Sequence, residues 1–210
     1  MSHGGATLID RVDVPEKAIA FTFDDGPDPL YTPQVLDIFR KAGGRATFFM
    51  VGRMMERHPD IVRAVVDAGH EIGNHTWSHP KLTELDAEAR VQELEDMDRL
   101  IRNRTGRAPT AFRPPFFDYD EDVAALCGRF GYRVFGAVNT DARDWDMPGV
   151  DHIVSSTRAS IASGSVLLFH DGFGDRSQTV EAVRILTAEL AAQGYRFVTV
   201  SELLQLSEGK

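Results

Sequence analysis

Short apolar runs alternate with helical periods along almost the whole chain, and this alternation limits the fold more than any other feature. Runs rich in β-branched or aromatic residues predict strands, whereas apolar residues spaced three to four positions apart predict helices. The predicted strands span residues 18–23, 46–51, 70–73, 111–113, 133–138, 166–169 and 196–200. Because the two patterns alternate about seven times, we expect an α/β fold built on a parallel sheet, closed or open.

Six stretches between these strands have helical periodicity. They span residues 32–42, 59–68, 86–105, 120–130, 150–162 and 179–193. Several end at a glycine, such as Gly43 or Gly106, which adopts the left-handed conformation of a helix terminus at little cost. The 210 residues with 42% hydrophobic composition suffice for one core. We therefore expect a single catalytic domain over residues 1–210, with its core at about 16–206.

Composition narrows the classes of partner. A net charge of −9 argues against nucleic acid or an anionic membrane surface. No run approaches the roughly 20 apolar residues of a membrane span. The single cysteine, Cys127, excludes an internal disulfide, and its apolar surroundings predict a buried structural thiol. We expect a monomer.

The first five residues, MSHGG, lack the basic start and the apolar core of a signal peptide. This predicts either a cytoplasmic protein or an exported protein from which the signal has been removed.

Seven polar side chains fall at or just after the C-terminal ends of predicted strands. They are Asp24, Asp25, His75, His79, Arg113, Asp144 and His170. In a parallel α/β barrel these strand ends meet at one mouth, where such enzymes carry their active sites. We therefore expect the seven side chains to form one site.

The adjacent carboxylates of Asp24 and Asp25 are the first half of a predicted metal site. A turn in the sequence DDGP explains one of these residues but not both, and two neighbouring carboxylates repel unless a cation lies close. His75 and His79 are four residues apart, which alone also fits a solvated loop. With Asp25 they form a two-histidine, one-carboxylate set that leaves a position for water or substrate. Zinc is the first expectation, and cobalt, iron or another divalent ion fits the same ligands.

The other polar residues have paired interpretations. Arg113 precedes two prolines and could pair with a carboxylate, or it could be a surface arginine before a turn. Trp145 follows Asp144 on a predicted loop, an arrangement found in glycan clefts, although a core tryptophan fits equally well. His170 could be structural, but a hydrogen bond from its ring to Asp144 would raise its pKa and make it a general acid.

Five motifs in order resemble one family. They are TFDDGP at 22–27, HTWSH at 75–79, RPPF at 113–116, DARDW at 141–145 and LFH at 168–170. The set resembles the polysaccharide deacetylases, carbohydrate esterase family 4, which share the catalytic domain of the chitooligosaccharide deacetylases of nodulation. The resemblance implies a distorted (β/α) barrel with about seven strands and a groove open to a polymer.

The resemblance also implies roles at the metal site. Asp24 would be the general base, and Arg113 would hold it in place. Asp25, His75 and His79 would bind one divalent metal ion.

Further roles concern the substrate. The backbone N–H of Phe116 would complete the oxyanion site, and Trp145 and Leu168 would shape the pocket for the acetyl methyl group. His170 would be the general acid, tuned by Asp144. The family often has Tyr-Gly where this chain has two phenylalanines at 116–117, which adds bulk at the edge of the groove.

These roles predict a metal-dependent hydrolase acting on an acetylated glycan. Metal-activated water, an Asp base and a His acid would remove acetyl groups from N-acetylglucosamine in peptidoglycan or chitin oligomers. The alternatives are O-deacetylation of acetylated xylan and deacylation of a small amide, because the motifs report the chemistry and not the groove.

Three other classes of function use part of the same residues. A glycoside hydrolase needs paired carboxylates about 5–9 Å apart and leaves the histidines without a role. A non-haem iron oxygenase uses the same triad of ligands but leaves the second Asp without a role. A glycan-binding module on an inactive scaffold would be expected to have lost some of the seven polar residues.

Overall fold

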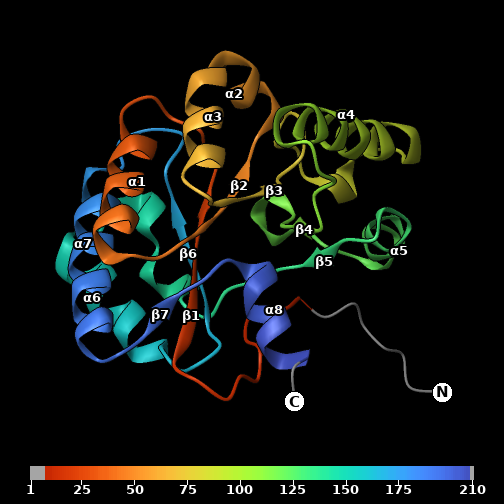
Figure 1. Cartoon of the computed structure of the whole chain (residues 1–210). Coiled ribbons are helices and arrows are strands. Elements are labelled where there is room, and N and C mark those ends of the chain that lie inside the picture. The colour runs from red at the N-terminus through yellow and green to blue at the C-terminus, as the bar shows by residue number, and fades with distance from the viewer. Residues whose placement is uncertain (1–7, 209–210) are drawn as a thin grey trace.

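A parallel sheet of seven strands forms the centre of the computed structural model, which describes residues 8–208 (Figure 1). The strands are β1 (Ala18–Asp24), β2 (Thr47–Met50), β3 (Glu71–Asn74), β4 (Ala111–Phe112), β5 (Arg133–Val134), β6 (Val166–His170) and β7 (Arg196–Phe197). Their order is β5-β4-β3-β2-β1-β6, and β7 pairs with the beginning of β1. The α/β fold and the distorted (β/α) barrel are therefore confirmed.

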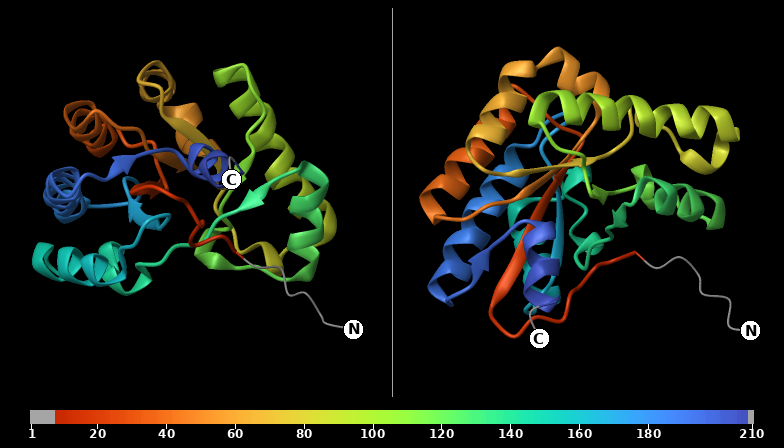
Figure 2. Two further views of the ribbon diagram at one scale, coloured as in Figure 1. Left: turned by 60° about the horizontal axis from the view of Figure 1, so that its bottom comes forward. Right: turned by 45° about the vertical axis from the view of Figure 1, so that its right-hand side comes forward.

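Within residues 8–208, eight α-helices surround the sheet. They are α1 (Tyr31–Ala42), α2 (Gly52–Arg57), α3 (Pro59–Asp67), α4 (Ala87–Thr105), α5 (Glu121–Phe130), α6 (Val150–Ser160), α7 (Ser177–Ala192) and α8 (Val200–Glu208). Seen end-on, α1, α7 and α6 lie on one side of the strands, and α4 and α5 lie on the other (Figure 2). All six predicted helices are present, whereas α2 and α8 were not predicted.

Strand β1 is central, and all seven of its residues are buried. Successive side chains of a strand point to opposite faces. Phe21 and Phe23 pack in the aromatic core beneath the helices, where Phe21 stacks on Phe169 at 5.6 Å. Thr22 and Asp24 face the interior of the barrel instead. The sequence thus places the carboxylate of Asp24 at the inner rim, where the apolar run of β1 ends.

Two predicted strands proved too long. Within the stretch 133–138, only β5 forms a ladder with a neighbouring strand. After it, Phe135 bridges to Ile9, and Val138 donates to the carbonyl of Val166. The stretch 196–200 ends at Phe197, because Thr199 and Glu202 exchange hydrogen bonds and begin α8. This reciprocal pair is a capping box, which starts a helix.

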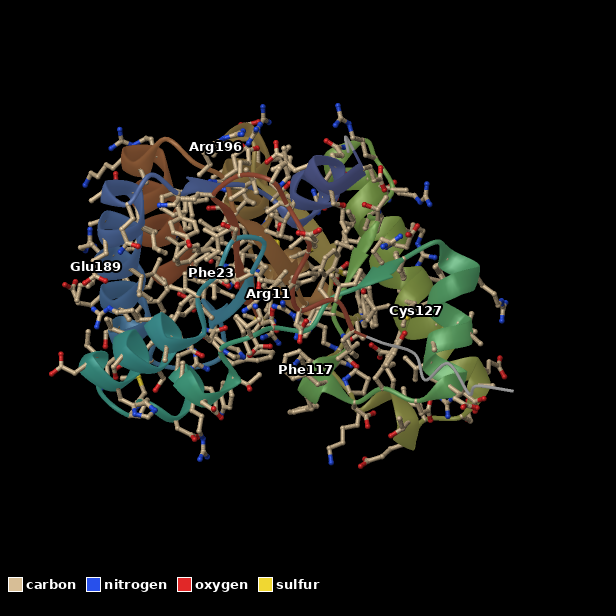
Figure 3. All side chains as sticks on the ribbon, turned by 90° about the horizontal axis from the view of Figure 1, so that it is seen from below. Arg11, Phe23, Phe117, Cys127, Glu189 and Arg196 are labelled. Atoms are coloured by element: carbon tan, nitrogen blue, oxygen red, sulfur yellow. The ribbon has the colours of Figure 1, made fainter. Side chains whose placement is uncertain are left out.

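The N-terminal segment closes the barrel between β5 and β6. Ile9 donates to the carbonyl of Val134 at 2.9 Å and accepts from Gly136 at 3.0 Å. The next carbonyl, that of Asp10, accepts from Val166 of β6 at 2.9 Å. Figure 3 accordingly shows Arg11 near the middle of the molecule, between α1, α6 and α7 on one side and α4 and α5 on the other.

Other expectations have mixed outcomes. Cys127 is buried, as predicted, and burial raises the pKa of its thiol to about 12. No helix between residues 8 and 208 has both the length and the apolar character needed to cross a bilayer. Residues 1–5, on which the expectation about localisation rests, lie outside the described residues. The single domain over 1–210 and the monomer stay predictions.

Candidate active site

The carboxyl ends of the strands bring the seven predicted polar residues to one mouth of the barrel. Asp24 ends β1 directly opposite His170, which ends β6, because the two are partners in the parallel ladder. The next residue, Asp25, faces the histidines that follow β3, and Arg113 follows β4. Asp144 begins a short 3-10 helix (Asp144–Asp146) that meets β6.

Asp25, His75 and His79 form a compact cluster. Oδ1 of Asp25 lies 3.5 Å from Nε2 of His75 and 3.1 Å from Nε2 of His79. Each residue offers one ligand atom, and the three atoms lie within 4.8 Å of one another. Among the described residues, this buried Oδ1 has no hydrogen-bond partner despite both neighbours. An orphaned carboxylate oxygen between two imidazole nitrogens fits a divalent cation.

The local backbone aims these three groups. Asp25 and His79 have positive φ angles of 74° and 63°, and Thr76 has 67°, so the chain turns sharply at each of them. Side chains stabilise these turns: Asn74 Oδ1 accepts from the N–H of Thr76, and Thr76 Oγ1 accepts from the N–H of His79. Such strained positions persist only where surrounding contacts hold them.

The protonation of the cluster also suits a cation. Burial alone would raise the pKa of Asp25, but its contacts with His75 and His79 outweigh burial and lower that pKa below the usual range. Nδ1–H of His75 donates to the carbonyl oxygen of Arg113 at 2.6 Å. This bond places a proton on Nδ1, so that in the neutral ring Nε2 is the atom that can bind a metal, as in other metal-binding histidines.

Arg113 is a fully buried side chain that holds Asp24. Its Nη1 donates to Asp24 Oδ1 at 2.7 Å and to Thr22 Oγ1 at 2.6 Å. Nε and Nη2 donate to the carbonyl oxygens of Phe135 and Gly136 at 3.3 and 2.7 Å. Asp24 Oδ2 lies 3.7 Å from Nε2 of His75. Arg113 therefore fixes one oxygen of Asp24 and leaves the other beside the cluster.

Asp144 and His170 form the second ion pair of the site. His170 Nδ1–H donates to Asp144 Oδ1 at 2.8 Å, and its backbone N–H donates to Oδ2 at 2.8 Å. Thr179 Oγ1 also donates to Oδ2 at 2.9 Å. Burial alone would lower the pKa of His170, but the charge of Asp144 and this hydrogen bond raise it to about 9. His170 is thus protonated at neutral pH.

Replacing Asp144 by Asn is expected to lower the pKa of His170, because the charge that opposes burial is removed. In the metal-free protein, an NMR titration should show the His170 ring losing its proton near pH 9, and at a lower pH in Asp144→Asn. Any reaction that needs the protonated ring should decline with rising pH, and this decline should come at a lower pH in Asp144→Asn than in wild type. Thr179→Val removes only a hydrogen bond to Asp144 and serves as the control. Equal His170 pKa values in Asp144→Asn and wild type would contradict this origin of the shift.

The three predicted substrate-contacting residues lie at the same mouth. Phe116 is 64% exposed, and within the described part of the chain its backbone N–H has no acceptor. Trp145 is 39% exposed, with its ring 5.4 Å from that of His170. Leu168 is buried on β6, where Asn139 hydrogen-bonds both its N–H and its carbonyl.

Sequence reasoning missed some residues of the site. Thr22 precedes the paired aspartates and shares Arg113 with Asp24; a lone polar residue inside an apolar strand was the available signal. Asp171 is fully buried, and its Oδ2 accepts from Thr32 Oγ1 at 2.5 Å. Burial, together with the nearby Asp25 and Asp24 charges, raises the pKa of Asp171 to about 7. It links the end of β6 to the beginning of α1.

A cavity of about 630 Å³ lies at the opposite, N-terminal end of the strands. Some of its polar groups are paired with one another: Arg45 with Glu202, and Glu71 with Ser201. None of the seven polar residues predicted for the site lines this cavity.

A family model described as polysaccharide deacetylase matches residues 11–135. The chain belongs to this family. A peptidoglycan-N-acetylglucosamine deacetylase of Bacillus cereus is 45% identical, covering 90% of this chain and 89% of the relative. A chitooligosaccharide deacetylase of a Bradyrhizobium species is 35% identical, covering 89% and 90%. The structure of the peptidoglycan deacetylase PdaC from Bacillus subtilis aligns with a TM-score of 0.84 at 33% identity, covering 94% of this chain and 95% of that one.

As a polysaccharide deacetylase, the chain is a hydrolase that acts on carbon–nitrogen bonds. The Phe116-Phe117 pair has φ angles of 59° and 53°, in the left-handed region that favours glycine. The ring of Phe117 lies 5.9 Å from the guanidinium carbon of Arg113. In this polysaccharide deacetylase, the Phe117 side chain thus occupies space beside the buried arginine.

Proposed function

We propose that this polysaccharide deacetylase removes acetyl groups from N-acetylglucosamine residues of peptidoglycan or chitin oligomers, using one divalent metal ion. Zinc is the first expectation for this ion. The observation that carries the proposal is the cluster of Asp25, His75 and His79, whose ligand atoms lie within 4.8 Å of one another. Beside it lie two carboxylates with separate partners: Asp24 on Arg113, and Asp144 on His170. The names of the relatives support the choice of glycan.

Asp25, His75 and His79 would hold the ion. When bound, a divalent cation supplies Lewis-acid chemistry that lets water lose a proton near neutral pH. Asp24 accepts that proton as the water oxygen forms a bond to the acetyl carbon. Arg113 keeps Asp24 oriented, because it donates to one of its oxygens at 2.7 Å. Two adjacent aspartates thus have separate roles: Asp25 binds the metal, and Asp24 is the base.

The second half of the reaction concerns the departing nitrogen. As the carbon–nitrogen bond breaks, protonated His170 donates its Nε2 proton to the nitrogen, and acetate and a free amine leave. The Nδ1 bond to Asp144 keeps Nε2 as the atom that donates. The N–H of Phe116 would stabilise the oxyanion, a type of contact often contributing about 3 kcal/mol. Trp145 and Leu168 would enclose the acetyl methyl group.

The geometry favours this proposal over the other classes. The neighbouring carboxylates of Asp24 and Asp25 both face His75 at 3.7 and 3.5 Å, so they do not flank a glycosidic bond from opposite sides. An oxygenase triad would give no role to Asp24 with its buried arginine. An idle binding module would give none to the raised pKa of His170. Acetylated xylan and small amides remain outcomes of the test below.

Acetate release by metal-stripped protein tests the proposal. Chitooligosaccharides, peptidoglycan fragments and acetylated xylan would be assayed with and without added zinc or cobalt. We expect release only with metal, and faster release from the two N-acetylglucosamine substrates. Preference for xylan would replace the proposed glycan, and activity confined to small amides would exclude a polymer. A protein that binds no metal would contradict the site itself.

A further inference from the structure

Three exposed aromatic rings gather at the mouth of the site. Among the described residues, the large exposed aromatic side chains are Phe116 at 64%, Trp145 at 39% and Phe173 at 45%. The rings of Phe116 and Phe173 lie 4.7 and 5.4 Å from the ring of His79, and Trp145 contacts His170. Apolar rings left in water around one opening indicate a surface that a ligand covers. Phe173 belongs to none of the five sequence motifs.

The turn that presents Phe173 is held firmly. Arg176 is buried, and its guanidinium donates to the carbonyl oxygens of Gly172 at 2.7 Å and Phe173 at 2.5 Å. The same guanidinium donates to the carbonyl of Trp145 at 3.4 Å. Farther along the turn, Asp175 accepts a hydrogen bond from the hydroxyl of Tyr31 on α1 at 2.9 Å. Arg176 thus joins the Phe173 turn to the Trp145 loop.

We propose that Phe173 is a sugar-binding residue that stacks on a pyranose ring next to the acetylated one, and that Arg176 positions it. Phe116 and Phe173 both border His79, the most exposed of the three cluster residues. Trp145 lies on the His170 side, so the aromatic surface extends across the reacting centre. The apolar C–H face of a pyranose matches an aromatic ring, whereas a small amide has nothing to place on Phe173.

This inference rests on the proposed function and specifies its substrate as an oligomer. Contacts with remote sugar units can be used to orient the reacting amide, so their loss lowers turnover of long substrates more than of short ones. The rigid turn adds to this effect, because a ring already held in place loses little entropy on binding. The number of sugar units in the substrate is therefore the variable that tests the role of Phe173.

The test compares Phe173→Ala with wild type on chitopentaose and on a small aryl acetate. We expect kcat/KM for the pentamer to fall about tenfold, several times more than for the ester. Phe173→Trp should restore most of the loss. Tyr195→Ala, an aromatic truncation beside β7 at the opposite end of the sheet, is the matched control. Equal losses on both substrates, or no loss on the pentamer, would overturn the proposal.

The role of Arg176 is tested by a double-mutant cycle. If Arg176 acts through Phe173, Arg176→Met should lower pentamer turnover in wild type and have little further effect in Phe173→Ala. Unfolding measurements on each variant exclude loss of fold as the cause. Full additivity of the two losses would contradict positioning through Phe173.

A binding measurement separates this inference from the proposed function. Calorimetric titration of zinc-loaded protein with chitopentaose at low temperature, using Asp24→Asn to prevent turnover, reports affinity without acetate release. Weaker binding by Asp24→Asn/Phe173→Ala supports the stacking role even if wild type releases no acetate, in which case the proposed function fails alone. Equal affinity of the two proteins overturns the stacking role even if wild type is an active deacetylase.

Discussion

The substitution Asp24→Asn is expected to lower kcat by about 10³-fold while the protein still binds one metal ion. General-base catalysis contributes about 10²–10⁴-fold, and an amide oxygen accepts from Arg113 but takes no proton from water. Asp25→Asn should instead abolish metal binding together with turnover, because Asp25 provides the carboxylate between His75 and His79. Metal content of the two purified variants, measured beside acetate release, checks this division.

The two substitutions control for each other, because each removes one negative charge from adjacent residues. Asp24→Asn also leaves the buried Arg113 without its counter-ion, so it should lower the free energy of unfolding, and metal content must be measured well below the melting temperature. If Asp24→Asn lost the metal and Asp25→Asn kept it, the assignment of base and ligand would be reversed.

His170→Ala is expected to reduce deacetylation of amides far more than that of esters. An amine leaves poorly unless it is protonated, whereas an alkoxide or phenoxide leaves more easily, so an acid worth about 10²–10⁴-fold matters mainly for the amide. Chitopentaose and an aryl acetate, assayed with the same zinc-loaded variant, provide the comparison. Because the charge of Asp144 raises the pKa of His170, the wild-type amide activity should also decline at alkaline pH, as the ring loses its proton.

An equal loss on amide and ester would exclude the acid role of His170 and favour a role in binding or orientation. His170→Gln keeps hydrogen-bonding capacity without an acidic proton at neutral pH, so it should behave like His170→Ala on the amide. Recovery of amide turnover in His170→Gln would show that hydrogen bonding, not proton donation, is what the residue contributes.

Much of the fold could be predicted because strands buried on both faces are continuous apolar runs. β1 is such a run, and its polar end at Asp24 and Asp25 marked the rim of the sheet. The site followed from the same logic, since parallel strands bring their carboxyl ends to one edge. Asp24 and His170, far apart in sequence, are partners in one ladder for this reason.

The features that escaped prediction depend on contacts between distant segments. Nothing local in residues 9–12 shows that they fill the gap between β5 and β6. The helix α8 did carry a local signal, the capping pair of Thr199 and Glu202, but the apolar run before it predicted a longer strand. Phe173 lies between two glycines in a turn, where sequence alone does not distinguish a solvent-exposed ring from a buried one.

The closing segment has a consequence for the order in which this enzyme matures. Arg113 donates to the carbonyls of Phe135 and Gly136, and these two residues are fixed in turn by pairing with Ile9. The carbonyl of Asp10 accepts from Val166 of β6, so residues 9–10 cannot complete their docking until β6 has been made and placed. Contacts so distant in sequence form late in folding. The arginine that orients Asp24 thus gains its full support only when residues 9–10 dock between β5 and β6, so the geometry of the base depends on a contact between segments far apart in the sequence.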